Sequence, residues 1–543
     1  MLERLIENWL DSAGERSYQR CFCQILTGQG FHIVHSTAHT PLEFGKDVIA
    51  VSPENKLVGY QLKGHPGGTM KPRDFDAIRG QLEQLATLAI DIPGYEKKVL
   101  EECYLVTNGE IDEAVYYQIQ RLNDSLVQRG HLPEKIKTIT RGKLLAWALS
   151  LGLSLWPSEM QDFGNLVKLL NYSGHEMFPA HIFDSLLRNT LCFDEEVKSA
   201  ELKRRMTSAA IMVAVALHSF SRRKNHYAEI TAWTMFITYV IAACEKNGVN
   251  YAKHGKEAVL SARNAIYDLL GQLCEEAAER EVLFEGDLYT DFSFYSPRVL
   301  LLSALMAVYW MWSEAETWER PHHKVLVEKL IPDTLPPKWL WGEGAISNFL
   351  AFFWYRKKNN ESEDTDKMVA SLLALLLLNK TGSSQGEPLA SPYYNTEEVV
   401  QHQYSKVLGC LDPFEGDSFD RQSYFCESLM MCLVRSNLKP ACKELWPMFT
   451  KLSHERVVPD QAWQFCLYRT GDAARNETHI YPSKVHWGDL QKICEERSAE
   501  DIPVALKADP VLLLLFVNIF PFRASFSTIG FLQKEFDGTA PSS

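Results

Sequence analysis

The residues best suited to chemistry are an aspartate, a glutamine and a lysine between positions 47 and 63. Asp47 begins an apolar run rich in β-branched residues, and Gln61 and Lys63 end a second such run. The segment between the two runs, Ser52–Lys56, has turn composition, so the pattern predicts a β-hairpin. Pairing across this hairpin would bring Asp47 close to Gln61 and Lys63.

These three residue types suit the hydrolysis of a phosphodiester bond. The reaction needs a cation to neutralise the charge that develops on the phosphate, and a water made nucleophilic close by. The Asp47 carboxylate is a natural oxygen ligand for Mg²⁺, with Mn²⁺ as an alternative, and Gln61 offers a neutral carbonyl oxygen. Lys63 would polarise the attacking water or stabilise the developing negative charge. We therefore predict a catalytic role for all three residues and a metal site at Asp47 and Gln61.

The same stretch resembles the PD-(D/E)xK nuclease superfamily, in particular its Mrr-like restriction endonuclease branch. Members of that branch carry a glycine-x-aspartate step, a hairpin, and a Gln-x-Lys or Glu-x-Lys pair. Here these read Gly45-Lys46-Asp47 and Gln61-Leu62-Lys63. The resemblance covers roughly the first quarter of the chain, and no family is recognised beyond it. It implies a metal-dependent DNA endonuclease.

The elements expected around the hairpin follow the order usual in that family. A helix precedes the hairpin, and a helix, a buried strand, a second helix and a short strand with a final helix follow it. Their expected ranges are 15–27, 73–88, 102–109, 113–129, 136–139 and 143–147. The fold class that we expect is an α/β restriction-endonuclease-like domain at residues 1–155, followed by a large, mostly α-helical region at 156–543.

Two glutamates are further candidates for the site. Glu15 lies in line with the apolar stripe of its helix, so it could face the metal site, as the first-helix glutamate often does in the resembled family. Ser12-x-x-Glu15 is also a capping-box pattern, which would make this glutamate structural. Glu43 precedes Asp47 in the loop that enters the hairpin and is either a metal ligand or a solvated loop residue. We predict Glu15 as catalytic and Glu43 as a metal ligand, with both alternatives open.

Three basic residues follow the hairpin on or just before the next helix. Lys71, Arg73 and Arg79 could bind backbone phosphates of DNA. They could equally form a solvated face with the acidic residues between them. We predict them as nucleic-acid-binding residues.

The composition of the chain argues against several other classes of protein. The 543-residue chain has a net charge of −13, which argues against a protein that coats nucleic acid by bulk charge. Residues 1–150 hold 17 Lys and Arg against 19 Asp and Glu, so most of the acidic character belongs to the later region. The 12 cysteines include no Cys-x-x-Cys pair, which favours free thiols in a reducing compartment. No uncharged apolar run reaches the ~18 residues of a membrane span, so we expect a cytoplasmic protein without membrane contact.

The later region has helical rather than strand-like patterning. Helices are expected at 198–220, 228–247, 257–278, 297–315, 346–355, 366–379, 396–411, 422–436 and 510–520. A segment near 381–394 rich in Gly, Ser and Pro would divide this region into two subdomains.

Two functions of different class compete. The first is a metal-dependent DNA endonuclease whose helical region senses, regulates or assembles; RNA is an alternative substrate. By resemblance, such nucleases often serve bacterial restriction or anti-phage defence. The second is a catalytically inactive nuclease-fold protein that binds nucleic acid or acts as an assembly subunit. Because one such site cuts one strand, we expect a homo-oligomer or a partner protein that binds the acidic helical region.

Overall fold

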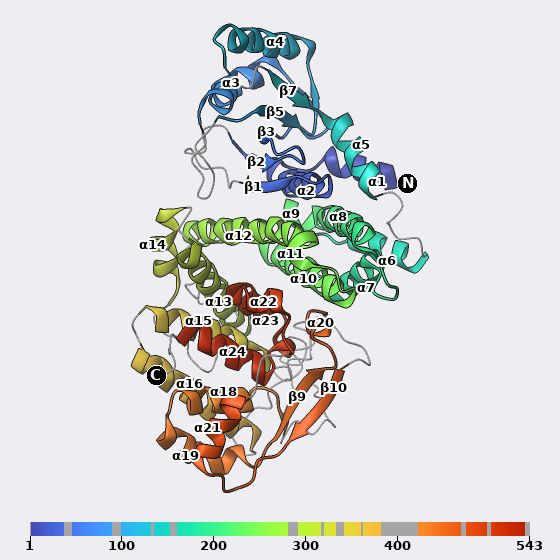
Figure 1. Cartoon of the computed structure of the whole chain (residues 1–543). Coiled ribbons are helices and arrows are strands. Elements are labelled where there is room, and N and C mark those ends of the chain that lie inside the picture. The colour runs from blue at the N-terminus through green and yellow to red at the C-terminus, as the bar shows by residue number, and fades with distance from the viewer. Residues whose placement is uncertain are drawn as a thin grey trace. The chain divides into compact units, whose positions relative to one another are not determined.

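The computed structural model describes most of the chain, with gaps between its described segments. The segments are 2–36, 46–89, 99–131, 135–152, 160–280, 292–316, 320–332, 342–359, 362–381, 422–468, 474–496 and 501–537. The chain forms two compact units, Met1–Leu269 and Leu270–Ser543, and each is described by itself (Figure 1).

A mixed five-stranded sheet is the centre of the N-terminal part, in the strand order β1-β2-β3-β5-β7. The strands are β1 (His32–Ser36), β2 (Val48–Val51), β3 (Leu57–Lys63), β5 (Glu102–Thr107) and β7 (Ile136–Ile139). Strands β1, β2 and β3 pair antiparallel, whereas β3, β5 and β7 pair parallel. The predicted hairpin is confirmed, with Val48 opposite Tyr60 and Val51 opposite Leu57. Its turn contains Asn55 at a φ of 63°, a left-handed conformation that asparagine tolerates well.

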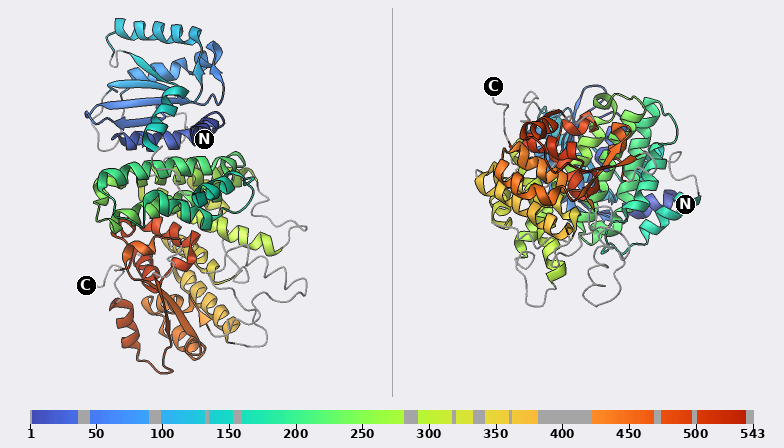
Figure 2. Two further views of the ribbon diagram at one scale, coloured as in Figure 1. Left: turned by 90° about the vertical axis from the view of Figure 1, so that its right-hand side faces the viewer. Right: turned by 90° about the horizontal axis from the view of Figure 1, so that it is seen from below.

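Helices cover both faces of this sheet (Figures 1 and 2). They are α1 (Leu2–Leu10), α2 (Glu15–Gly28), α3 (Pro72–Thr87), α4 (Glu113–Gln128) and α5 (Arg141–Gly152). Helices α3 and α4 bury their apolar stripes against the face that carries Ile49, Leu57 and Leu105. Helix α2 packs on the opposite face, where the Phe22 and Tyr60 rings lie 5.1 Å apart. Burial of these apolar faces fixes the register of the hairpin, because a slip by one residue would turn them outward.

Further helices of the same unit follow the sheet in sequence, and α2 packs against one of them, α8. They are α6 (Met160–Leu170), α7 (Ala180–Leu191), α8 (Ser199–Ala216), α9 (His218–Arg222), α10 (His226–Lys246), α11 (Tyr251–His254) and α12 (Lys256–Glu279), of which α12 continues past Leu269. Arg20 of α2 forms a buried ion pair with Glu229 of α10, with Nη1 and Oε2 2.9 Å apart. Gln24 Nε2 donates to the carbonyl of Ala258 at 2.9 Å. The compact unit thus extends beyond residue 155, and the domain boundary predicted there stays a prediction.

By length and composition, α10 is the one helix among the described residues that could cross a membrane, but 94% of its apolar window is buried within the structure. The core helix of a soluble protein passes the same test, so this is weak evidence for a span.

The second unit is mostly helical. Its longer helices are α13 (Phe292–Glu316), α14 (Pro321–Leu330), α15 (Ile346–Lys358), α16 (Ser362–Lys380), α18 (Cys426–Arg435), α19 (Lys439–Phe449), α21 (Trp487–Glu496), α23 (Pro510–Ile519) and α24 (Phe526–Asp537). The helix expected at 396–411 and most of the predicted division near 381–394 lie outside the described residues. The cysteines that the structure describes are all free, and most are buried.

This mostly helical unit also contains a three-stranded sheet, β10-β9-β8, which the sequence patterning did not indicate. The strands are β8 (Gln422–Ser423), β9 (Ser453–Pro459) and β10 (Ala474–His479). The sequence of β10, ARNETH, is almost wholly polar, so it lacks the alternation of apolar residues that identifies a half-buried strand. Pairing with β9 along the whole length of β10, from Ala474↔Pro459 to His479↔His454, stabilises this strand instead.

Candidate active site

Asp47 and Gln61 meet at the open end of the hairpin, as predicted. Asp47 immediately precedes β2, and its backbone N–H donates to the carbonyl of Tyr60 at 3.0 Å, which continues the ladder by one residue. The Asp47 Oδ2 atom accepts hydrogen bonds from Gln61 Nε2 at 2.5 Å and from the Leu62 N–H at 2.6 Å. Both side chains are buried, with Asp47 4% and Gln61 2% exposed. The carboxylate is therefore held by the strand that carries the other polar residues.

The side-chain amide of Gln61 is the second possible metal ligand, beside the Asp47 carboxylate. Its Oε1 atom is buried and has no hydrogen-bond partner within the described part of the chain. A buried amide oxygen left unpaired costs about 1–3 kcal/mol, so such an atom requires an explanation. Carboxylate and amide oxygens are ligands that Mg²⁺ accepts, although here the Gln61 amide nitrogen, and not its oxygen, faces the Asp47 carboxylate. The donor set thus fits the predicted cation.

Lys63 meets Glu15 beside this pair. Lys63 Nζ lies 3.6 Å from Glu15 Oε1, and Glu15 Oε2 accepts a hydrogen bond from the Gly64 N–H at 2.9 Å. The side chains are 21% and 26% exposed, so both can meet a solvent-borne substrate. Helix α2 begins at Glu15 itself, which places this carboxylate at the C-terminal end of β3.

The capping box expected between Ser12 and Glu15 does not form, although Glu15 does lie in the first turn of α2. The N-cap of α2 is Gly14, and no side chain caps the helix. Ser12, the expected partner in a capping box, donates its hydroxyl to the carbonyls of Asn8 and Trp9 in the preceding turn. The Glu15 carboxylate therefore serves the end of β3, while its catalytic role stays a prediction.

Tyr18 is a residue of the site that sequence reasoning missed. Its hydroxyl donates to the carbonyls of Lys63 at 3.1 Å and Val106 at 3.2 Å, so it fixes the ends of two neighbouring strands. Burial, and then the nearby carboxylates of Glu15 and Asp47, raise the pKa of Tyr18, which therefore stays a neutral donor. Its position in an apolar helical stripe gave only the signal of a core residue.

The remaining predicted ligand, Glu43, and Gly45 of the glycine-x-aspartate step lie outside the described residues. Lys46, next to Asp47, is buried, and burial lowers the pKa of its ammonium group.

The three predicted phosphate contacts differ in their surroundings. Lys71 Nζ pairs with Asp112 at 2.9 Å, and Arg79 Nε lies 3.5 Å from Glu83 one turn on. These pairs agree with the alternative of a solvated, charge-balanced face. Arg73 is exposed, and among the described residues no ion pair involves it. Arg73 is thus the best placed of the three to meet a phosphate.

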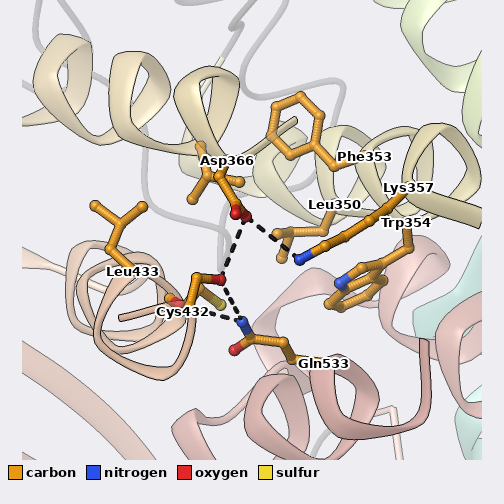
Figure 3. Close-up of a pocket in the computed structure, with 10 residues that line it drawn as sticks. Leu350, Phe353, Trp354, Lys357, Asp366, Cys432, Leu433 and Gln533 are labelled. Carbon is orange, nitrogen blue, oxygen red and sulfur yellow. Dashed lines mark hydrogen bonds and ion pairs between the residues drawn. The ribbon is translucent and has the colours of Figure 1, made fainter. Parts of the chain in front are cut away.

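A separate small hollow lies in the second unit between α15, α16, α18 and α24 (Figure 3). Its polar groups bond to one another: Lys357 Nζ lies 3.4 Å from Asp366, and the Ser436 hydroxyl donates to the same carboxylate at 3.3 Å. Gln533 Nε2 donates to the Ser436 hydroxyl at 3.4 Å. Because these groups satisfy one another, the hollow does not call for a ligand.

Comparisons of the chain with protein-family models, with curated proteins and with solved structures found no match.

Proposed function

We propose that the first unit is a metal-dependent endonuclease that hydrolyses phosphodiester bonds of DNA at Asp47, Gln61, Lys63 and Glu15. The observation that carries this proposal is the pairing of the buried Asp47 carboxylate with an unpartnered Gln61 amide oxygen at one end of the hairpin. A lysine on the same strand, two residues on, provides the positive charge.

Asp47 and Gln61 would hold the cation, which is Mg²⁺ or Mn²⁺. When bound, the cation supplies neutralisation of phosphate charge and lowers the pKa of a bound water. The two protein oxygens carry one negative charge between them, so a bound dication would keep more positive charge for the substrate phosphate than it would beside two carboxylates. The burial of both side chains keeps their geometry fixed.

Lys63 and Glu15 act on the water and the phosphate. The Lys63 ammonium donates hydrogen bonds to the attacking water or to a non-bridging phosphate oxygen, where negative charge develops. Glu15 positions this ammonium through the ion pair at 3.6 Å and holds the following loop through the Gly64 N–H. Tyr18 keeps the carbonyl end of β3 in place from beneath.

The finer fold assignment, a restriction-endonuclease-like domain, belongs to the same proposal. It is supported by a hairpin that carries the polar residues, followed by a helix and two parallel strands. A role in bacterial restriction or anti-phage defence rests only on the resemblance of the Gly-Lys-Asp and Gln-Leu-Lys steps. The helical segments would then supply regulation or assembly.

One observation favours the inactive alternative. Asp47 Oδ2 already accepts two short hydrogen bonds, and Lys63 already has Glu15 as a partner. These groups are therefore largely satisfied without any cation, as they would be in a domain that only binds nucleic acid.

The deciding experiment is cleavage of supercoiled plasmid by the purified chain with Mg²⁺, with Mn²⁺ and with EDTA. We expect metal-dependent nicking that Lys63→Ala reduces by at least about 10²-fold, because an electrostatic group at the reacting phosphate is lost. The matched control is Lys135→Ala, which removes an exposed lysine outside the site and should leave nicking unchanged.

Equal nicking by wild type and Lys63→Ala would overturn the assignment of the site. A wild-type chain that binds DNA in a gel-shift assay but cuts it under none of the three conditions would support the inactive alternative.

A further inference from the structure

A group of metal-ligand residues lies in the second unit, apart from the residues of the proposed nuclease. Glu275 of α12 and the adjacent His322 and His323 of α14 place one ligand atom each within 4.8 Å of one another. The carboxylate and the two imidazoles come from different helices, so their convergence is a property of the fold. We propose that these three residues form a binding site for a transition-metal dication of the Zn²⁺ class.

The spacing of the two best-defined ligand atoms suits one ion. His323 Nε2 and Glu275 Oε1 are 3.2 Å apart. Two ligands at about 2.0–2.2 Å from a tetrahedral Zn²⁺ lie about 3.3–3.6 Å from each other, so an ion fits between these atoms after a small outward movement. The ion would replace the hydrogen bond that joins them in its absence.

The surroundings orient the buried imidazole as metal sites in proteins do. Tyr309 Oη lies 2.9 Å from His323 Nδ1, which fixes the ring and directs Nε2 at the carboxylate. A hydrogen-bond partner on the second ring nitrogen is the usual companion of a metal-bound histidine. His323 is fully buried, so its ring cannot swing away from this position.

Gly271, one turn before Glu275, makes room for this arrangement. A Cβ atom there would lie 2.8 Å from Arg320 Nη1, 3.2 Å from Tyr309 Oη and 3.6 Å from His323 Cε1. Glycine inside a helix costs about 1 kcal/mol relative to alanine. The close approach of α12 to these three side chains accounts for the glycine at this position.

The charges of Glu275 and Arg320 favour one class of cation over another at this site. Arg320 Nη1 lies 3.5 Å from Glu275 Oε1, so the single carboxylate already shares its charge with a guanidinium. A hard cation such as Mg²⁺ or Ca²⁺, which depends on several oxygen ligands, is therefore disfavoured. Zn²⁺ gains most of its affinity from the two neutral imidazoles, and water would complete the coordination. The site would join α12 to α14.

The test is titration of the full chain with Zn²⁺ after treatment with EDTA and dialysis, followed by Co²⁺ as an absorption probe of coordination. We expect one ion per chain, a Co²⁺ spectrum of low coordination number, and a rise in Tm on adding Zn²⁺. Exposed His322 can be replaced without disturbing the core, and His322→Ala should weaken Zn²⁺ binding by at least about tenfold. Glu275→Gln, a second variant at a half-exposed position, should do the same.

Two controls separate this site from other histidines and from the proposed nuclease. His486→Ala removes an exposed histidine of the same unit and should leave Zn²⁺ binding unchanged. Asp47→Ala should remove cleavage and leave Zn²⁺ binding unchanged, so the two proposals can fail independently. Absence of Zn²⁺ binding by the wild type, or equal binding by wild type, His322→Ala and Glu275→Gln, would overturn the proposal.

Discussion

Glu15 carries the most specific information about the site at the scale of single residues. Its carboxylate contacts the Lys63 ammonium and the Gly64 N–H, both at the end of β3, while the helix that it begins has no side-chain cap. A favourable interaction with the N-terminal end of the helix dipole does not by itself require a contact between Glu15 and a lysine. The contact therefore agrees with a positioning role for Glu15 in the proposed reaction.

Glu15→Gln should separate positioning from structure. Glutamine keeps an acceptor for the Gly64 N–H but loses the charge that attracts Lys63, so we expect kcat for plasmid nicking to fall about tenfold or more. The Mg²⁺ dependence and the Tm should stay unchanged, and Glu15→Asp should restore part of the rate. Glu110→Gln, at an exposed position, is the matched control. Full activity of Glu15→Gln would leave this residue a structural role only.

The elements themselves were largely predictable, for reasons that differ along the chain. The hairpin of β2 and β3 follows from two apolar runs and a turn, and the residues Asp47 and Gln61 follow from its register. The contacts of Glu15 and Tyr18 depend on how α2 packs on the finished sheet, which no local pattern encodes. Strand β10 was missed because its pairing with β9, and not its own composition, makes it a strand.

Strand β3 has almost no spare room at its centre. Gly59 lies under Leu85 and Leu100, and an added Cβ would lie 3.0 Å from Leu85 Cδ1 and closer still to Leu100 Cδ1. Both leucines are fully buried, so neither can move into solvent. Close packing against Leu85 and Leu100 thus fixes the centre of the strand that carries Gln61 and Lys63.

Two glycine substitutions should have opposite effects on stability. Gly59→Ala should lower the free energy of unfolding by about 1–3 kcal/mol, because it overpacks the core behind β3. Gly80→Ala, on the exposed side of α3 with nothing within 4 Å of the added Cβ, should raise it by about 0.5–1 kcal/mol. Urea unfolding followed by circular dichroism measures both. A neutral or stabilising Gly59→Ala would contradict the packing described for this strand.

At the scale of the whole molecule, net charge and buried histidines have opposite effects on the stability of the folded state when the pH falls. The net charge of −13 at pH 7 decreases toward the isoelectric point near 5.7, which relieves self-repulsion and favours compact states. His454 opposes this trend. Burial lowers its pKa from 6.5 to about 4, and its ring stacks on Phe449 with centroids 4.1 Å apart.

The stability of the second unit should therefore fall on mild acidification. Below pH 6.5 the unfolded chain binds a proton at His454, whereas the folded chain does not until the pH approaches 4. The contribution of the neutral His454 to the free energy of unfolding is therefore fully present above pH 6.5 and is lost as the pH falls toward about 4. The slope from one such group is at most about 1.4 kcal/mol per pH unit. Urea midpoints at pH 7, 6 and 5 should show it, and His454→Phe should flatten the dependence. Equal slopes in both proteins would contradict a neutral His454.

The separations in sequence across the site also imply an order of assembly. Asp47 and Gln61 are 14 residues apart and meet as soon as the hairpin closes, whereas Glu15 and Gly64 are 49 apart and Tyr18 and Val106 are 88 apart. Closing longer loops costs more chain entropy and takes longer. On the ribosome, the two oxygen ligands would therefore come together well before β5 has emerged to receive the Tyr18 hydroxyl. In the proposed nuclease, the end of β3 that carries Lys63 would therefore gain its last support only when β5 pairs beside it.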